Sequence, residues 1–315
     1  MSLENKTLVS VVGPTGIGKT AHAISLAQHF DTDIISSDSR QFYKEMQIGT
    51  AVPSDDELAA ARHHFIQHKS IFDSYSVGDF ERDALRTLET RFKEKDVVIM
   101  VGGSGLYNNA VTEGLDEFPP IDPAIRQELN LTLKKDGLKA LQAELKKRDA
   151  AYHEQVDLEN PHRLIRALEV SIGTGKPYSS FLLQKRKVRP FRTVTVGFEA
   201  DRAIIYERIN QRVDVMVAEG LVAEANHLLP HRKLNALQTV GYKELFQYFD
   251  GQWTLDFAIS EIKKNTRRFA KRQLTWFRRN EDTVWVPFDI AEKDLIAAVE
   301  NMLKKDKAVK NKTRP

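Results

Sequence analysis

The sequence of 315 residues contains no cysteine, which excludes disulfide bonds and metal sites held by thiolates. It has no apolar run long enough to cross a membrane, and no stretch with the character of a secretory signal opens it. We therefore expect a cytoplasmic protein with no membrane partner. The excess of positive over negative charge is small, since the formal net charge is +3, but the basic residues are unevenly distributed. The length is sufficient for a substantial core.

One stretch, GPTGIGKT, fits the G-x-x-x-x-G-K-[ST] phosphate-binding loop at every fixed position. A β-branched apolar run, Leu8–Val12, precedes it, and a helical pattern, Ala21–Phe30, follows it. Such a loop points backbone N–H groups at phosphate oxygens, and the next helix adds the positive end of its dipole. Lysine adds a positive charge, and the threonine hydroxyl suits Mg²⁺. We predict that a phosphate or diphosphate binds to Gly13, Pro14, Thr15, Gly16, Ile17, Gly18, Lys19 and Thr20.

A second β-type run, Asp33–Ser37, ends in Asp38. Ligands of doubly wound sheets bind beyond the carboxyl ends of the strands, so we expect Asp38 beside the phosphate loop. There its carboxylate could act as a base or a metal partner. An Asp at this position could equally be a helix N-cap, and the residues alone favour neither alternative.

A third unit begins with Val97–Val101, an apolar run typical of a central parallel strand. Gly102–Tyr107 then turns the chain into another helix and places Ser104 at the same edge of the sheet. The glycines could also serve only close packing of that helix. Together these units predict an α/β fold, a P-loop NTPase-like parallel sheet with flanking helices.

Between Pro119–Pro120 and Pro190 the sequence has no strand-like run and is rich in helix-forming residues. We predict an all-helical insertion domain in a discontinuous α/β core. The expected boundaries are 1–118 and 191–304 for the core, 119–190 for the insertion, and 305–315 for a disordered basic tail.

Basic residues concentrate in Thr254–Arg279, where pairs of Lys and Arg repeat every four residues along a helical pattern. The pairs are Lys263-Lys264, Arg267-Arg268 and Lys271-Arg272, with Arg278-Arg279 expected on the same side. A charged helix face is usually just solvated, but a face of one sign favours a polyanion, and we predict nucleic acid. Trp276 and Phe277 could pack inside or stack on a base.

Several further blocks follow the phosphate loop in order. They are Asp38-Ser39 with Tyr43, Ile48–Ala51, Gly102–Tyr107, Asn160–Arg163 with Arg166–Glu169, Arg212 with Gly220-Leu221, Val240–Lys243 and Ala270–Trp276. Over the span from the loop to about Arg279 the sequence resembles the bacterial tRNA dimethylallyltransferases, or tRNA isopentenyltransferases. These enzymes transfer the dimethylallyl group of dimethylallyl diphosphate to the exocyclic amine of the adenine 3′-adjacent to the anticodon.

The resemblance implies dimethylallyl diphosphate as donor, the anticodon stem-loop of tRNA as partner, Mg²⁺ at Thr20 as cofactor, and a monomer. Asp38 would take the proton of the amine, Ser104 would bond near the reacting groups, and Lys19 with Arg212 would stabilise the diphosphate. The adenine would leave its stack to enter the site. The implied tRNA contacts are Asp38, Ser39, Arg40, Gln41, Ser104, Arg126, His162, Arg163, Leu164, Ile165, Arg166, Gln238, Thr239, Val240, Gly241, Tyr242 and Lys243.

The sequence departs from the family pattern at four positions. Ser104 stands where Thr is usual, Glu45 and Gln47 replace Gly and Asp, and His162 replaces a frequent Gln. These differences concern RNA contacts more than the reaction. Two other classes remain open: a P-loop small-molecule or nucleotide kinase, and a non-catalytic RNA-binding P-loop protein. The kinase has no use for the basic helix, and the binding protein has none for Asp38 and Ser104.

Overall fold

The computed structural model of the protein describes the backbone of residues 6–182 and 187–312, with side chains as far as Lys304. The contacts divide the chain into two compact units, unit 1 of Met1–Glu113 with Arg189–Pro315, and unit 2 of Gly114–Val188. The chain thus leaves and re-enters unit 1 slightly earlier than the sequence boundaries of 118 and 191. The return point is fixed by Arg189, which donates hydrogen bonds to the carbonyls of Ala110 and Val111 and pairs with Glu81.

Unit 1 is built on a six-stranded parallel sheet in the order β3-β2-β4-β1-β5-β6. The strands are β1 Thr7–Val12, β2 Ile34–Ser36, β3 His63–His64, β4 Val97–Val101, β5 Arg192–Glu199 and β6 Val284–Pro287. The central strands are continuous apolar runs because helices cover both faces of the sheet. This confirms the predicted fold class. The sequence analysis missed the edge strand β3, whose two residues are too few for a pattern.

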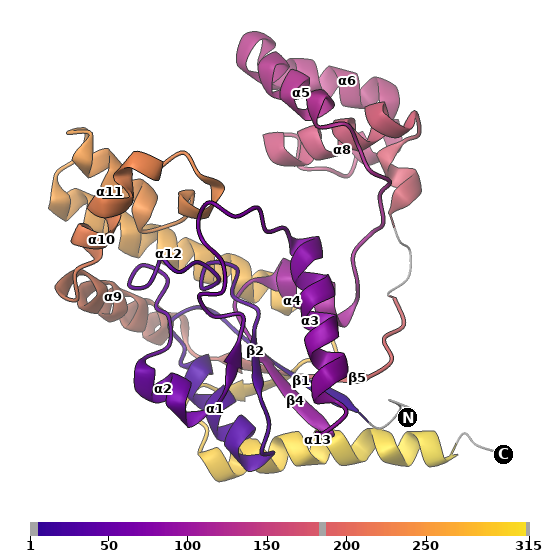
Figure 1. Ribbon diagram of the computed structural model, residues 1–315, viewed down its shortest axis with the longest axis vertical. Coiled ribbons are helices and arrows are strands. Elements are labelled where there is room, and N and C mark those ends of the chain that lie inside the picture. The colour runs from indigo at the N-terminus through magenta and orange to yellow at the C-terminus, as the bar shows by residue number, and fades with distance from the viewer. Residues whose placement is uncertain (1–5, 183–186, 313–315) are drawn as a thin grey trace. The chain divides into compact units, whose positions relative to one another are not determined.

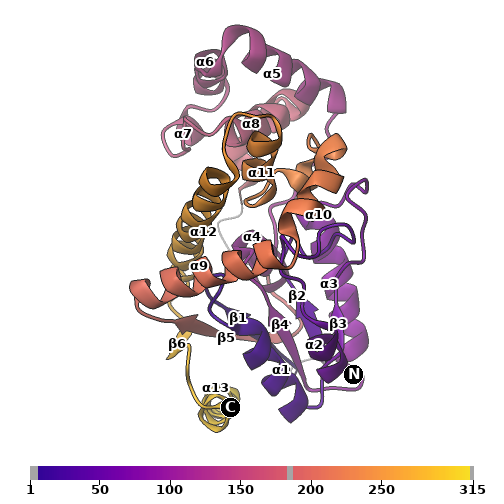
Figure 2. The ribbon, with the colours of Figure 1, turned by 90° about the vertical axis from the view of Figure 1, so that its left-hand side faces the viewer.

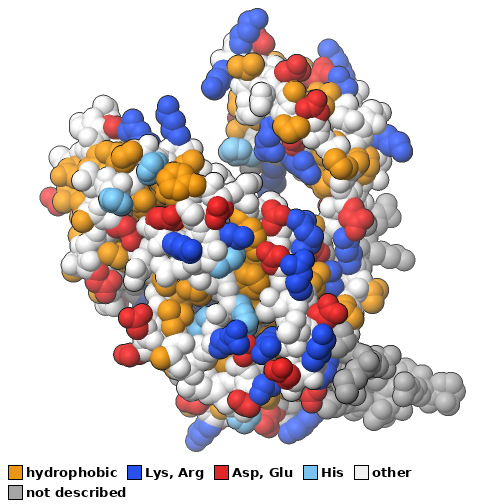
Figure 3. Space-filling view, viewed as in Figure 1, with side chains coloured by type: hydrophobic (Ala, Val, Ile, Leu, Met, Phe, Trp, Pro, Cys, Tyr) orange, Lys and Arg blue, Asp and Glu red, His pale blue; other side chains and the backbone are white. Residues whose placement is uncertain are grey.

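Helices lie on both faces of the sheet (Figure 1). Alternate side chains of the strands pack against them in two apolar layers. Leu8 and Met100 pack with helices α3 (Val77–Arg91) and α4 (Gly105–Thr112), whereas Val9 packs with α1 (Lys19–His29) and α13 (Glu292–Lys312). The outer face of α3 is solvated and carries charges of both signs, including the pairs Asp79–Arg82 and Asp83–Arg86 (Figure 3).

A group of helices from the second half of the chain completes unit 1. Helices α9 and α12 lie side by side (Figure 2). The remaining elements of unit 1 are α2 Asp55–Ala60, α9 Arg202–Ala218, α10 Leu221–Leu228, α11 Tyr242–Phe249, α12 Leu255–Phe277, and the short 3₁₀ helices Leu229–His231 and Asn235–Leu237. Among the described residues, no helix combines the length and apolar character that crossing a membrane requires.

Unit 2 contains only helices in its described part. They are α5 Pro123–Asp136, α6 Leu138–Arg148, α7 Ala150–His153, α8 Pro161–Thr174 and the 3₁₀ helix Tyr178–Phe181. Gly137, at φ +79°, separates α5 from α6 in what the sequence presented as one helical stretch. Their inward leucines, among them Leu129, Leu141 and Leu168, form a separate small core.

The C-terminal helix corrects one expectation. From the sequence we expect a disordered tail from residue 305 onward, but α13 continues to Lys312. Lysines have good helix propensity, so a basic stretch without Gly or Pro can extend a helix that is already formed. The last part of the expected tail, residues 313–315, lies outside the described residues.

Candidate active site

The phosphate loop leaves β1 with the backbone conformations that its glycines permit. Gly13, Gly16 and Gly18 have φ values of +146°, +79° and +96°, which favour glycine. A Cβ on Gly13 would lie 2.8 Å from the carbonyl oxygen of Phe198 in the neighbouring strand β5. Helix α1 begins at Lys19, directly after the loop, so the unpaired N–H groups of its first turn are available to an anion.

Two half-buried cations, Lys19 and Arg212, lie at this loop. Burial lowers the pKa of Lys19 from 10.5 to about 8, while Asp38 opposes the shift and Arg212 adds to it. Burial also lowers the pKa of Arg212, and Asp38 counteracts this through its charge. Lys19 Nζ donates only to the carbonyl of Pro14, at 2.7 Å, among the described residues. A site with two desolvated cations and one nearby carboxylate is suited to bind an anion.

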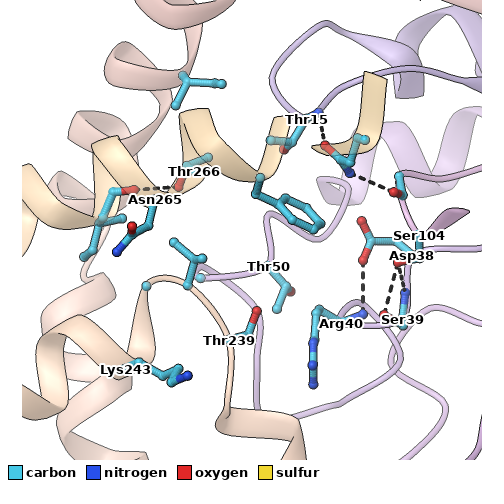
Figure 4. A pocket seen from close by; sticks show the side chains of 18 of the residues that line it. Thr15, Asp38, Ser39, Arg40, Thr50, Ser104, Thr239, Lys243, Asn265 and Thr266 are labelled. Atoms are coloured by element: carbon cyan, nitrogen blue, oxygen red, sulfur yellow. Dashed lines mark hydrogen bonds between the residues drawn. The ribbon is translucent and has the colours of Figure 1, made fainter. Parts of the chain in front are cut away.

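A cavity of about 920 Å³ opens beside the loop at the carboxyl edge of the sheet (Figure 4). Thr15, Asp38, Ser104 and Arg212 line it, whereas Lys19 and Thr20 lie outside its lining. Figure 4 shows Asp38 and Ser104 close together, with Thr239 and Lys243 on another side of the cavity. The apolar part of its wall includes Ile209, Val213, Met216 and Phe269. This combination suits a ligand with one charged and one apolar end.

Asp38 does not cap a helix, because the chain after it forms turns and the next helix is α2. Its Oδ1 accepts a hydrogen bond of 3.0 Å from the backbone N–H of Arg40, so one carboxylate oxygen closes a local turn. The hydroxyl of Ser104 accepts from the N–H of Ser39 at 3.1 Å and lies 3.1 Å from the Ser39 hydroxyl. The N-cap alternative is therefore wrong, and Ser104 is joined to the turn that carries Asp38.

The glycines of the turn after β4 are required for close packing. A Cβ on Gly102 would overlap Ser37, and one on Gly105 would overlap the ring of Trp276. A Cβ on Gly103 would overlap the side-chain amide of Gln273. The turn is thus pressed between the end of β2 and helix α12, and this close approach holds Ser104 in place.

Two positioning residues escaped the sequence analysis. Gln273 is nearly buried on α12 and bonds to both glycine-containing loops. Glu224 on α10 accepts from the N–H groups of Gln47, Ile48 and Gly49 at 2.8–3.0 Å and from the Tyr242 hydroxyl at 2.7 Å. It thereby holds the loop that brings Gly49 and Thr50 to the cavity. The sequence contained one signal for Gln273, because it is an uncharged polar residue within a strongly basic helix.

The predicted tRNA-contacting residues of unit 1 divide into exposed residues and residues whose side chains are used inside the protein. Lys243 and Gln238 are exposed and line the cavity, together with Thr239, Val240 and Gly241. Gln41 uses its side-chain amide inside the protein, bonding to the carbonyl of Ala51 at 2.8 Å. Tyr242 is wholly buried with its hydroxyl on Glu224, so the expectation that its side chain contacts RNA is corrected.

Arg40 lines the cavity but already bonds within the protein, since its guanidinium donates to the carbonyls of Asn235 and Ala236 at 3.0 Å. The guanidinium therefore ties the turn after β2 to the segment that precedes α11. Any RNA contact of Arg40 would use the remaining donors of the guanidinium.

In unit 2 the predicted contacts divide in the same way. His162 and Arg163 are exposed on α8, whereas Leu164 and Ile165 are buried in the core of the unit, which corrects the expectation for these two side chains. Arg126 on α5 and Arg166 on α8 both bond to the buried carboxylate of Glu169, at 3.3 and 3.0 Å. The contiguous block that resembles the family therefore contains surface and core positions in helical alternation.

The basic pairs of α12 do not share one face, because neighbouring helical residues are about 100° apart. Lys263 pairs with Asp214 on α9 at 2.6 Å, and Arg267 bonds to Asn210 at 2.7 Å and covers the ring of Tyr206. Arg268 and Lys271 instead line a shallow basic cleft on another side of the helix. Its complete lining is Arg268, Lys271, Arg272, Thr275, Trp276 and Arg279.

Trp276 and Phe277, which the sequence could not place, have different environments. Phe277 is buried, and Trp276 is half-buried and lines both the cavity and the basic cleft. Arg279 lies over the ring of Trp276, 5.5 Å from its centroid. One of the two aromatics is therefore available to a ligand.

The parallel sheet, the loop and the cavity together define a P-loop α/β protein whose phosphate loop lies beside a cavity with an apolar wall. Residues 41–280 match the family model of IPP transferase, and the chain belongs to that family. The tRNA dimethylallyltransferase of Christiangramia forsetii is 58% identical over 94% of this chain and 98% of that protein. That of Flavobacterium johnsoniae is 56% identical over 95% and 99%.

Solved structures agree with this relationship. The full-length tRNA isopentenylpyrophosphate transferase of Bacillus halodurans matches with a TM-score of 0.72 at 35% identity. The match covers 97% of this chain and 99% of that one. The phosphate loop lies before the start of the matched family model at residue 41, but within the span that the full-length relatives cover.

Proposed function

We propose that the protein transfers the dimethylallyl group of dimethylallyl diphosphate to the exocyclic amine of the adenine 3′-adjacent to the anticodon of tRNA. The nitrogen forms a bond to the allylic carbon, the carbon–oxygen bond breaks, and diphosphate leaves with the electron pair. The proton of the amine passes to a base. The products are isopentenyladenosine in the tRNA and diphosphate.

The observation that carries this proposal is the pair of half-buried cations beside a cavity with an apolar wall. Lys19 and Arg212 are both desolvated, which makes their attraction for a diphosphate stronger than at a surface. The apolar residues Ile209, Val213 and Phe269 line the same cavity and suit a prenyl group. A nucleotide kinase would use the same loop, but the curated relatives are named tRNA dimethylallyltransferases, which favours prenyl transfer.

Asp38 is the proposed base. One carboxylate oxygen closes the turn with Arg40, and the carboxylate lies in the cavity lining beside Ser104. An adenine amine is a weak nucleophile, so orientation and proton removal by a carboxylate assist its attack. Ser104 keeps the hydroxyl of the Thr that is usual in the family, and this hydroxyl is joined to Ser39.

We further propose that Mg²⁺ accompanies the diphosphate at Thr20, the second residue of α1. The described residues hold no group of three His, Asp or Glu that could bind a metal ion by itself. This fits an ion that is bound mainly through substrate phosphates and water, as Mg²⁺ commonly is. Such an ion would supply positive charge to the leaving diphosphate.

For tRNA, we propose that each unit contributes a set of exposed residues. Gln238 and Lys243 lie at the cavity of unit 1, Arg268 and Lys271 in the basic cleft, and His162 and Arg163 on α8 of unit 2. Cationic side chains of this kind neutralise backbone phosphates. We expect one protein chain to carry out the reaction.

The test is a label-transfer assay. The protein is incubated with labelled dimethylallyl diphosphate, or with γ-labelled ATP, in the presence or absence of unmodified tRNA. Label from the prenyl donor that appears in tRNA supports the proposal. Label from ATP on a small molecule would instead indicate a kinase, and retention of tRNA without any transfer would indicate a binding protein.

A further inference from the structure

We propose that Gln273 is a positioning residue that sets the separation between the phosphate loop and the turn that carries Ser104. This inference rests on the proposed transfer reaction, because that separation would fix the distance between donor and acceptor. The side chain connects the two elements directly. Its Oε1 accepts from the backbone N–H of Thr15 at 2.9 Å, and its Nε2 donates to the carbonyl of Gly103 at 2.8 Å.

The surrounding residues show that this bridge is closely fitted. Gln273 is only 5% exposed, although it directly follows the exposed basic residues Lys271 and Arg272. Gly103 has no room for a side chain because a Cβ would overlap Nε2 of Gln273. One turn further along α12, the ring of Trp276 likewise leaves no room for a Cβ on Gly105. Helix α12 therefore contacts the turn on both sides of Ser104.

The bridge leads from the donor side of the site to the acceptor side. Thr15 belongs to the phosphate loop after β1, and Gly103 to the turn after the neighbouring strand β4. Ser104 follows Gly103, and its hydroxyl accepts from the N–H of Ser39, next to Asp38. A change in the position of the turn would thus reach the groups around the base. Reacting atoms must lie about 3–3.5 Å apart, and an error of about 1 Å can lower the rate about a hundredfold.

A glutamine suits this place for a chemical reason. It is neutral, with one acceptor and one donor group, so it satisfies an N–H and a carbonyl without adding negative charge beside a diphosphate site. The bond also occupies the N–H of Thr15. Of the loop residues predicted from the sequence to bind diphosphate, Thr15 would therefore contribute less through its backbone than the residues from Gly16 onward.

The test replaces the amide with a side chain of similar length that cannot form the bridge. Gln273→Met should lower the single-turnover transfer rate at saturating donor and tRNA by about thirtyfold to a hundredfold. Its affinity for inorganic diphosphate should remain within about threefold of the wild type, because Lys19 and Arg212 are unchanged. Gln211→Met, at an exposed position of α9, is the matched control and should leave both values unchanged.

Two further measurements separate positioning from general stability. Amide hydrogen exchange at residues 102–107 should become faster in Gln273→Met than in the control, whether or not the protein is catalytically active. Gln273→Glu should lose diphosphate affinity as well as rate, because it places a carboxylate beside the phosphate loop. If Gln273→Met does not fold, Gln273→Asn takes its place, since the shorter side chain can reach only one of the two loops.

Three results would overturn the proposal. They are a transfer rate within about twofold of the wild type, unchanged exchange at residues 102–107, or a loss of rate that is fully matched by a loss of diphosphate affinity. Failure of the proposed function has a different signature. In that case the wild-type protein transfers no prenyl group, while the exchange experiment still reports whether Gln273 holds the turn.

Discussion

At the scale of single residues, the ionisation of Lys19 governs how the site responds to pH. With a pKa of about 8, Lys19 is charged below this pH and mainly neutral above it. A diphosphate binds better to the charged form. We therefore expect the donor affinity of the wild-type protein to fall as the pH rises through 8. Titration calorimetry with inorganic diphosphate between pH 6.5 and 9.5 measures this.

The matched variant is Lys19→Met, which should bind diphosphate about tenfold to a hundredfold more weakly at pH 7, the range for losing a charge-assisted hydrogen bond. It should also lose the pH dependence near 8. Lys44→Met, at an exposed position, should behave like the wild type. A wild-type affinity that stays constant from pH 7 to 9 would contradict the role given to Lys19.

The same lowered pKa affects stability in the opposite direction. The unfolded chain keeps a lysine pKa near 10.5, so between about 8 and 10.5 it binds more protons at this residue than the folded protein does. The contribution of Lys19 to stability therefore increases with pH across this window. The free energies of unfolding of the wild type and Lys19→Met should therefore differ less at pH 9.5 than at pH 7.5. Denaturant unfolding at the two pH values measures this.

Asp38 combines a local and a chemical role, and the structure allows the two to be separated. Asp38→Asn keeps an oxygen that can accept from the N–H of Arg40, so the turn should persist while the base is lost. We expect a single-turnover rate lower by about a hundredfold or more, with tRNA affinity nearly unchanged. If Asp38→Asn reacts normally and only Asp38→Ala is impaired, the residue serves the turn alone.

At the scale of elements, helix α12 has two sides with different roles, so mutations on the two sides must be made separately. Arg268 and Lys271 line the basic cleft, whereas Arg267 bonds to Asn210 on α9. Arg268→Ala with Lys271→Ala should weaken tRNA binding and flatten the log–log salt dependence by about one unit per lost phosphate contact. Donor affinity should not change.

Arg267→Ala is the internal control on the same helix. It removes packing against Tyr206 as well as the hydrogen bond, so we expect a lower melting temperature with an unchanged salt dependence of tRNA binding. If Arg267→Ala alone changes the salt dependence of tRNA binding, RNA approaches the side of α12 that faces α9.

The elements also show what the sequence could and could not predict. The phosphate loop, Asp38 and Ser104 follow apolar runs, and the rule that parallel strands end at one edge of a sheet placed them together correctly. The role of Gln273 depends on two backbone groups far away in the chain, and no local pattern reveals them. Helical alternation explains why Leu164, Ile165 and Tyr242 were misassigned, since a family motif does not distinguish surface from core.

At the scale of the whole molecule, unit 2 is proposed to contribute to tRNA binding but not to donor binding, so a mutation there should separate the two. Arg163 is exposed on α8 of unit 2, whereas the cavity is lined only by residues of unit 1. Arg163→Ala should weaken tRNA binding by about threefold to thirtyfold, with inorganic diphosphate affinity unchanged. Arg166→Ala should in addition lower the melting temperature, because Arg166 bonds to the buried Glu169. Filter binding and thermal unfolding measure the two effects.

The half-buried cations Lys19 and Arg212 have a consequence for the amount of the protein in the cell. Without an anion their charged forms carry a desolvation cost that Asp38 only partly offsets, and a bound diphosphate compound would neutralise them. A ligand present at about a hundred times its dissociation constant stabilises a fold by about 2.7 kcal/mol. A difference of this size changes how often a protein is exposed to proteases. The amount of this protein should therefore follow the supply of the isoprenoid precursor, without any dedicated regulator.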